Sequence, residues 1–264
     1  MKFVVPALLA FLLIQCLVGL IWWVAYRIQR TSIVDIYWSL FIFIAAGFYF
    51  LYFASGSIAS LFFLMLAFFW AARLSAHIYF RSRGHGEDSR YQALRQQWGE
   101  AEKKKMLVFY FQQGVAAWIF SLPFLLIFSN PRGVFGAWEI AGVFIWIIAF
   151  NGESISDAQL MLFKQEPQNK GKVCRGGFWK YSRHPNYFFE WLNWIAFAWL
   201  AFPHSMGWLA LICPGLMYYF LNKVSGVPLA EKQALKNRSE EYVEYQRVTP
   251  VFFPWLPKKS ELLK

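Results

Sequence analysis

The sequence predicts an all-α polytopic membrane protein with seven transmembrane helices. Hydrophobic residues make up 58% of the 264 residues and charged residues only 16%, whereas soluble domains carry about 25% charged residues. The apolar residues gather in long stretches that are nearly free of charge, which is typical of helices that cross a bilayer. Strands of an outer-membrane barrel would instead alternate apolar with polar residues. The composition therefore excludes a soluble domain, a disordered chain and a barrel.

Seven apolar stretches account for the predicted spans. The first, residues 3–26, contains no charged residue. It is longer than the apolar region of a signal peptide and lacks a small-residue cleavage site, so we expect it to be retained. The other six are residues 33–53, 58–80, 106–128, 136–163, 185–202 and 206–221. We expect these spans to form one integral-membrane domain covering residues 1–264.

The distribution of basic residues predicts the orientation. Nearly all of the 26 Lys and Arg residues follow the first, third, fifth or seventh span, and cytoplasmic loops carry the excess of positive charge. We therefore expect an outside N-terminus and a cytoplasmic C-terminus. This topology also explains the net charge of +11, so we expect no nucleic-acid partner. The three scattered cysteines, Cys16, Cys174 and Cys213, predict neither a disulfide framework nor a metal site.

Several polar residues lie inside the predicted spans. A charged side chain at the centre of a membrane helix costs about 2.5–3.5 kcal/mol on insertion scales, so it usually faces a partner, a cavity or a substrate path. One alternative is that each is an interfacial residue that pairs with another, as Arg73 could with Asp157. Their common depth near the cytoplasmic boundary instead suggests a polar pocket that opens to the cytoplasm. They are Asp35 in the second span, Arg73 and His77 in the third, Glu153 and Asp157 in the fifth, and Asn186 and Glu190 in the sixth.

The segment from residue 152 to residue 194 contains a series of short motifs. They are Asp157-x-Gln159, Phe163-Lys164, Gly177-Phe178-Trp179, the run Ser182-Arg183-His184-Pro185-Asn186-Tyr187, and Glu190. Earlier pieces are Val34-Asp35-x-x-Trp38, Trp70-x-x-Arg73-Leu74 and Gly86-Glu87-Asp88-x-Arg90-Tyr91, and later ones include Gly226-x-Pro228, Glu231, Tyr242 and Tyr245. In this order and spacing, over most of the chain, they resemble the steroid 5-alpha-reductase family, in its broad bacterial branch.

The resemblance implies an enzyme that binds NADPH from the cytoplasmic side and reduces a carbon–carbon double bond conjugated to a carbonyl. The substrate would be an apolar lipid, steroid-like or isoprenoid. The host membrane would be the bacterial inner membrane, or that of the endoplasmic reticulum in a eukaryote. Positions matching Asp157, Asn186 and Glu190 hold the cofactor in the family. The full set of expected cofactor-binding residues is Arg73, Asp157, Lys164, Arg183, Asn186, Tyr187 and Glu190.

The phosphates of NADPH must be met by side chains, because the chain has no glycine-rich Rossmann turn. The alternative for most basic residues is that they only set the topology. Glu153 falls where better-studied members have an asparagine, and His184-Pro185 can be interpreted either as a ligand group or as the start of a helix. The phosphate-binding candidates are Arg73, Arg81, Arg83, Arg90, Lys164, Lys172, Arg175 and Arg183.

Reduction of an enone also needs a proton donor at the carbonyl oxygen. The resemblance places Asp35 where the family has a catalytic glutamate and Trp70 where it has a tyrosine. An indole cannot transfer a proton at accessible pH, so Tyr37 or Tyr79 is a candidate replacement. The alternative for Asp35 is a structural ion pair with Arg27 or Arg30.

A second enzyme class shares part of this pattern. Isoprenylcysteine carboxyl methyltransferases, which use S-adenosylmethionine, also have an Arg-His-Pro-x-Tyr run followed by an acidic, tyrosine-rich tail, here Glu240-Glu241-Tyr242-x-x-Tyr245. The early Asp35 motif and the many basic residues favour the reductase. A third reading, as a transporter or lipid-binding scaffold, would predict inverted repeats or broken helices, and neither is evident.

Overall fold

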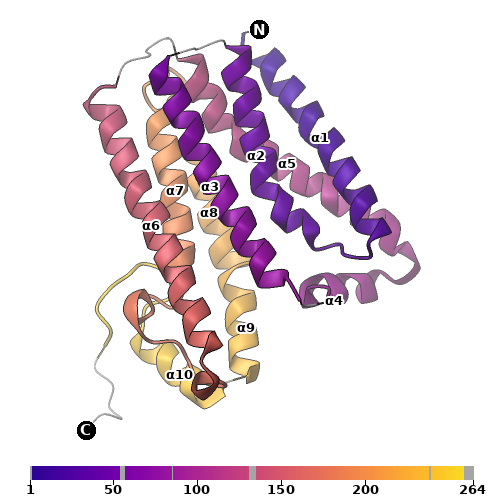
Figure 1. The fold of residues 1–264 in the computed structure, drawn as a ribbon, viewed down its shortest axis with the longest axis vertical. Coiled ribbons are helices and arrows are strands. Elements are labelled where there is room, and N and C mark those ends of the chain that lie inside the picture. Colours follow the sequence, from indigo (N-terminus) through magenta and orange to yellow (C-terminus); the bar gives the residue numbers. More distant parts are fainter. Residues whose placement is uncertain (1, 54–56, 85, 131–134, 238, 259–264) are drawn as a thin grey trace. The chain divides into compact units, whose positions relative to one another are not determined.

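The computed structural model describes residues 2–53, 57–84, 86–130, 135–237 and 239–258, and every regular element in these ranges is a helix (Figure 1). The all-α fold class is therefore confirmed for the described part of the chain. Helices satisfy their own backbone hydrogen bonds, which is what a bilayer requires of a spanning segment.

Within the described residues, five stretches are long and apolar enough to cross a membrane. Four of them coincide with predicted spans to within two residues, and the other, Ser89–Ser129, contains the predicted span 106–128 but begins 17 residues before it. They are α1 (Val4–Arg27), α2 (Ile33–Tyr52), α3 (Ile58–Ser82), the stretch Ser89–Ser129, which contains α4 (Ser89–Trp98) and α5 (Glu102–Ser129), and α6 (Ala137–Gln165). These helices identify the chain as an integral membrane protein.

The sixth and seventh predicted spans correspond to shorter helices. The sixth is α7 (Pro185–Ala201), whose 17 residues reach about 26 Å and fall short of a hydrocarbon core of about 30 Å. The seventh is a run of three kinds of helix: the 3-10 turn η4 (Gly207–Leu211), α8 (Ile212–Tyr219) and the π turn η5 (Phe220–Val224). The count of seven spans, and the orientation that depends on an odd count, therefore stay predictions.

The chain divides into two compact units, each described here by itself. Unit 1 comprises Met1–Phe135 and Ala201–Gly207, and unit 2 comprises Gly136–Leu200 and Trp208–Lys264. In unit 1, α2 packs against α3 and α5, and α1 packs against α5. Gly114 of α5 faces α1, where a Cβ would lie 2.7 Å from the end of the Gln15 side chain and 3.0 Å from Val18.

In unit 2, α6 and α7 lie side by side and antiparallel (Figure 1). At one end the indoles of Trp138 and Trp199 stack with their centroids 4.2 Å apart. Each indole N–H donates to the other residue's carbonyl oxygen, at 2.8 and 3.1 Å. Further along, Gly152 lets the helices close, since a Cβ there would lie 2.4 Å from the Phe189 ring. These contacts fix which residues of α6 face which residues of α7.

Several short elements of unit 2 lie where α6 ends and α7 begins (Figure 1). They are the 3-10 turns η2 (Pro167–Asn169) and η3 (Gly177–Lys180), followed at the end of the chain by α9 (Val227–Asn237) and α10 (Ser239–Val248). The C-terminal segment after α10 also runs there, because the Trp255 N–H donates to the Tyr181 carbonyl at 2.9 Å.

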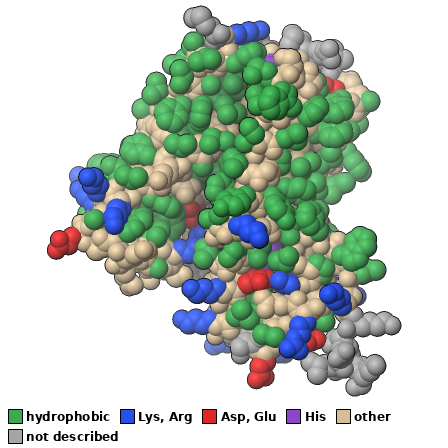
Figure 2. Space-filling view, turned by 180° about the vertical axis from the view of Figure 1, so that it is seen from behind, with side chains coloured by type: hydrophobic (Ala, Val, Ile, Leu, Met, Phe, Trp, Pro, Cys, Tyr) green, Lys and Arg blue, Asp and Glu red, His purple; other side chains and the backbone are tan. Residues whose placement is uncertain are grey.

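Large apolar side chains are exposed on the long helices, for example Leu12, Phe69 and Phe144. Figure 2 shows hydrophobic side chains covering a broad zone of the face drawn there, with most of the Lys and Arg side chains outside it. Large apolar side chains exposed along helices that are long enough to cross a bilayer fit contact with lipid.

Candidate functional site

Polar residues at helical spacing line the contact between α6 and α7. Residues three and four apart share a helix face, and the polar side chains on the faces that meet are buried, except that of Asn186, which is partly exposed. On α6 they are Glu153, Ser156 and Asp157, and on α7 they are Asn186, Glu190 and Asn193.

Asp157 and Asn186 are in direct contact across the two helices. The Asn186 Nδ2 donates to Asp157 Oδ1 at 3.1 Å, and Asn186 Oδ1 accepts the backbone N–H of Tyr187 at 3.0 Å. Glu190, one turn further along α7, is buried on the same face. The structure thus gathers the three residues on which the cofactor prediction rests.

A second polar pair lies deeper along the same faces. Asn193 Nδ2 donates to Glu153 Oε2 at 3.0 Å, and the Trp194 indole N–H donates to Glu190 Oε1 at 3.0 Å. Carboxylates buried between helices are costly unless they are hydrogen-bonded. Asn193 and Trp194 were not among the predicted site residues, although their spacing of three and four from Glu190 was the available signal.

The turn η3 is anchored on α6 by Gln159. Gly177 has a left-handed φ of 57°, and a Cβ there would lie 2.2 Å from Gln159 Nε2. The absence of a side chain lets the backbone cover the amide, so that Gln159 Oε1 accepts the Phe178 N–H at 3.0 Å. The Trp179 indole N–H also donates to the Ser156 carbonyl at 3.0 Å. The motif residues Gln159, Gly177, Phe178 and Trp179 thus hold the loop before α7 in place.

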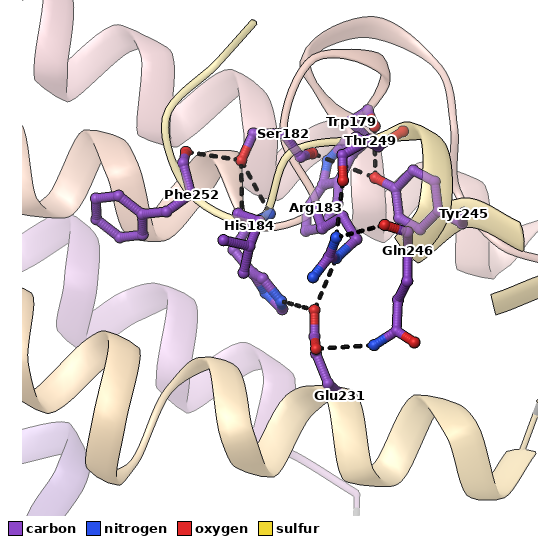
Figure 3. Close-up of polar contacts among 10 residues, drawn as sticks. Trp179, Ser182, Arg183, His184, Glu231, Tyr245, Gln246, Thr249 and Phe252 are labelled. Atoms are coloured by element: carbon purple, nitrogen blue, oxygen red, sulfur yellow. Dashed lines mark hydrogen bonds and ion pairs between the residues drawn. The ribbon is translucent and has the colours of Figure 1, made fainter. Parts of the chain in front are cut away.

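Arg183 is held by the C-terminal elements (Figure 3). Its Nε donates to Glu231 Oε1 at 2.7 Å. Its Nη1 donates to the backbone carbonyls of Gln246 and Thr249 at 3.0 and 2.7 Å. Only 11% of the Arg183 side chain and 17% of the Glu231 side chain are exposed, so the positive charge of Arg183 is balanced inside the protein.

His184 shares the same carboxylate. Its Nε2 lies 3.4 Å from Glu231 Oε1, while Glu231 Oε2 accepts the Gln246 side-chain amide at 2.8 Å. Burial lowers the pKa of His184 below its usual 6.5. Burial acts to raise the pKa of Glu231, but hydrogen bonds from His184 and Arg183 outweigh it and lower that pKa to about 2. The physical picture is a neutral imidazole that donates a hydrogen bond to an ionised carboxylate.

Further hydrogen bonds fix the start of α7. The Ser182 hydroxyl donates to the Phe252 carbonyl at 2.9 Å and accepts the His184 N–H at 3.1 Å. The Tyr245 hydroxyl donates to the carbonyls of Trp179 and, at 3.2 Å, Ser182. The helix α7 then begins at Pro185, as the interpretation of His184-Pro185 as a helix start requires. We call the contacts of Ser182, Arg183 and His184 with Glu231, Tyr245, Gln246, Thr249 and Phe252 the C-terminal clasp.

In unit 1, Asp35 is bound by two residues of α4. The Tyr91 hydroxyl donates to Asp35 Oδ1 at 2.6 Å, and Arg90 Nη2 donates to Oδ2 at 2.9 Å. Arg90 also pairs with Asp88 at 3.0 Å. The ion-pair partner of Asp35 is therefore Arg90, a phosphate-binding candidate in the sequence, and the tyrosine that reaches Asp35 is Tyr91. The motif Gly86-Glu87-Asp88-x-Arg90-Tyr91 was noted in the sequence, but nothing in it indicated that Tyr91 contacts Asp35.

Glu87 fixes the loop that leads into α2. Its carboxylate accepts the backbone N–H of Thr31, the Thr31 hydroxyl at 2.7 Å and the Ser32 N–H at 3.0 Å. Burial acts to raise the pKa of Glu87, but the hydrogen bonds from Ser32 and Thr31 outweigh it and lower that pKa. The Tyr110 hydroxyl donates to the Thr31 carbonyl. These bonds hold the first turn of α2, and with it Asp35.

The remaining predicted residues occupy varied positions. Trp70 is fully buried on α3, while Tyr37 is 37% exposed and stacks on Phe41 along α2. Arg73 is half-buried on α3 in unit 1, and Lys164 is exposed in the last turn of α6 in unit 2.

Two more residues lie near the start of α7 in unit 2. Tyr187 stacks on the His184 ring with centroids 5.4 Å apart. Arg175 Nη2 donates to the Glu241 carbonyl at 2.7 Å.

Comparison with known proteins gives one family match and one relative. The family model described as "Protein of unknown function (DUF1295)" matches residues 21–249. An uncharacterised protein of Schizosaccharomyces pombe is 27% identical over 285 aligned positions, which cover 96% of this chain and 80% of the relative. No solved structure matches.

Proposed function

Because the chain belongs to the DUF1295 family, which includes steroid 5-alpha-reductase-like membrane proteins, we propose that it is an NADPH-dependent membrane reductase. Its reaction is the reduction of a carbon–carbon double bond conjugated to a carbonyl, in an apolar lipid of steroid-like or isoprenoid type. The wide apolar surface of the long helices suits a substrate that arrives from the bilayer.

The observation that carries this proposal is the part-buried hydrogen bond between Asn186 and Asp157, with the buried Glu190 on the same face of α7 as Asn186. Ribose hydroxyls and the nicotinamide carboxamide donate hydrogen bonds, and carboxylate and amide oxygens accept them. Acceptors held between two helices and shielded from water bind such donors strongly. Bound NADPH would supply the hydride, and these residues would orient its ribose and nicotinamide.

Unit 1 supplies a candidate acid. When a hydride adds to the β carbon of an enone, negative charge develops on the carbonyl oxygen, which then needs a hydrogen-bond donor. Trp70 cannot donate a proton, but the Tyr91 phenol can: its single O–H, which Asp35 accepts at 2.6 Å in the structure, would turn to the substrate oxygen. In this proposal Asp35 orients Tyr91 and Arg90 anchors the carboxylate. Asp35 remains the alternative donor.

One observation favours the second enzyme class. The guanidinium of Arg183 is neutralised by Glu231 and by two backbone carbonyls, so it is poorly suited to bind a phosphate. A methyltransferase of the isoprenylcysteine type would use S-adenosylmethionine, which carries no phosphate. The C-terminal clasp would then serve a cofactor other than NADPH.

Fluorescence titration of the detergent-solubilised full chain tests the proposal. NADPH should saturate at a lower concentration than NADH, and S-adenosylmethionine should not compete with it. Asp157→Ala and Glu190→Ala should each abolish NADPH binding, because each removes a buried acceptor. Glu166→Ala, which removes an exposed carboxylate just after α6, is the control and should bind normally. Binding of S-adenosylmethionine without NADPH would replace the proposal with the second class.

A further inference from the structure

Asn193 has a buried oxygen that no described residue satisfies. The residue is 0% exposed in the middle of α7. Its Nδ2 donates to Glu153 Oε2 at 3.0 Å, but its Oδ1 has no hydrogen-bond partner among the described residues. Buried side-chain oxygens in folded proteins are nearly always hydrogen-bonded, so this one points to a donor from outside the chain.

The carboxylate of Glu153 determines which way the amide faces. Asn193 Nδ2 donates to Glu153 Oε2, so the amide presents its NH2 group to Glu153 and turns its oxygen away. Glu153 therefore acts as a positioning residue that presents Asn193 Oδ1 as a fixed acceptor.

The acceptor lies further along the face that carries the proposed cofactor residues. Asn193 follows Asn186 by two helical turns, which is about 10 Å along α7, and Glu190 lies between them on the same face. The polar groups thus continue from the start of α7 into its middle. A ligand that contacts Asp157 and Asn186 with one part would reach Asn193 with a second, uncharged part that extends two turns along α7.

We propose that Asn193 Oδ1 accepts a hydrogen bond from the carboxamide NH2 of the nicotinamide ring. This inference rests on the proposed function and identifies the residue that contacts the nicotinamide end of the cofactor. The nicotinamide is the uncharged end of the dinucleotide and tolerates a buried position between helices, whereas the phosphate-bearing adenosine end needs water or basic side chains. The carboxamide has two N–H donors, and one of them donates a hydrogen bond to Asn193 Oδ1.

A cofactor analogue without those donors tests the contact directly. In 3-acetylpyridine adenine dinucleotide phosphate, a methyl ketone replaces the carboxamide, so the carbonyl remains while both N–H groups are lost. The assay is displacement of NADPH fluorescence from the full chain in detergent by NADP+ or by this analogue. The wild-type chain should bind NADP+ about 10-fold more tightly than the analogue, the ratio expected for one buried hydrogen bond.

Asn193→Leu removes the acceptor at similar volume. This variant should lose affinity for NADP+ but not for the analogue, so that the ratio falls to about one. The matched control is Asn151→Leu, which replaces an exposed asparagine of α6 whose side chain bonds only its own helix. It should keep the wild-type ratio.

The outcomes separate this inference from the proposed function. If the wild-type chain binds NADPH but shows no preference for NADP+ over the analogue, the inference is overturned, whether or not the variant folds. An unchanged ratio in Asn193→Leu also overturns it and assigns Oδ1 to a buried water or to a hydroxyl of the lipid. If NADPH does not bind at all, the proposed function itself fails, and this inference fails with it.

Discussion

Removing the Glu231 carboxylate should be among the most destabilising single changes in unit 2. Glu231→Ala deletes the hydrogen bonds from Arg183 at 2.7 Å, Gln246 at 2.8 Å and His184 at 3.4 Å. It also leaves the Arg183 guanidinium, which is 11% exposed, without its counter-charge. Breaking one partner of a buried ion pair costs about 3–5 kcal/mol. For a chain of this size that corresponds to a fall in Tm of about 6–15 °C.

The assay is thermal unfolding in detergent, followed with a thiol-reactive dye. Cys174 and Cys213 are buried thiols, so they react only when the surrounding structure opens, and the exposed Cys16 is replaced by serine in every protein compared. Glu240→Ala, which removes an exposed carboxylate of α10, is the control and should change the Tm by no more than about 2 °C. The double variant Arg183→Ala/Glu231→Ala should lose less stability than the two single variants summed, because the unpaired charge is gone. Equal Tm values for Glu231→Ala and Glu240→Ala would refute the reasoning.

Four further predictions follow from the same structure. The folded-state pKa of His184 is below 6.5 and that of Glu231 is about 2, so the unfolded chain binds more protons in acid than the folded chain does. Thermal unfolding at a series of pH values should therefore show stability falling as the pH drops below 6.5, because of His184, and again between pH 4.5 and 2, because of Glu231. Tyr91→Phe should keep NADPH affinity in fluorescence titration and lose turnover of an enone lipid, and so should Asp35→Asn; loss of cofactor affinity in step with turnover would assign both residues to structure. Gly177→Ala should lower the free energy of unfolding in urea by about 1–3 kcal/mol, because its φ is 57° and its Cβ site is occupied, whereas Gly176→Ala, at an open position with ordinary backbone, should be nearly neutral. A reporter fused to the C-terminus should score as cytoplasmic, and a periplasmic or luminal signal would contradict the predicted orientation.

The long helices and the Asp157, Asn186 and Glu190 face were readable from the sequence because both depend on local periodicity. A span needs only a run of apolar residues, and a shared face needs only spacing of three or four. The helices α1, α2, α3, α5 and α6 accordingly begin and end within four residues of their predicted limits. The helix α4 has no apolar run, and its polar sequence gave no expectation of it.

The contacts that were missed join residues far apart in the chain. Glu231 meets Arg183 across 48 residues, and Tyr91 meets Asp35 across 56. No periodic pattern connects such pairs, so the sequence indicated no carboxylate partner for Arg183, and for Asp35 it suggested, besides the catalytic role, only a pair with Arg27 or Arg30. Only the packing of α9 and α10 around the start of α7, and of α4 beside α2, determines these partners.

The C-terminal clasp also sets the order in which the protein matures. Glu231, Gln246 and Phe252 all follow α7 in the chain, so the ribosome delivers them last. During synthesis α6 and α7 can pair through Trp138 and Trp199 while the start of α7 still lacks its contacts with the C-terminal segment. Those contacts form only when translation reaches Glu231 and the residues after it, so a nascent chain that stalls before that point lacks the bonds of Arg183 and His184 to Glu231.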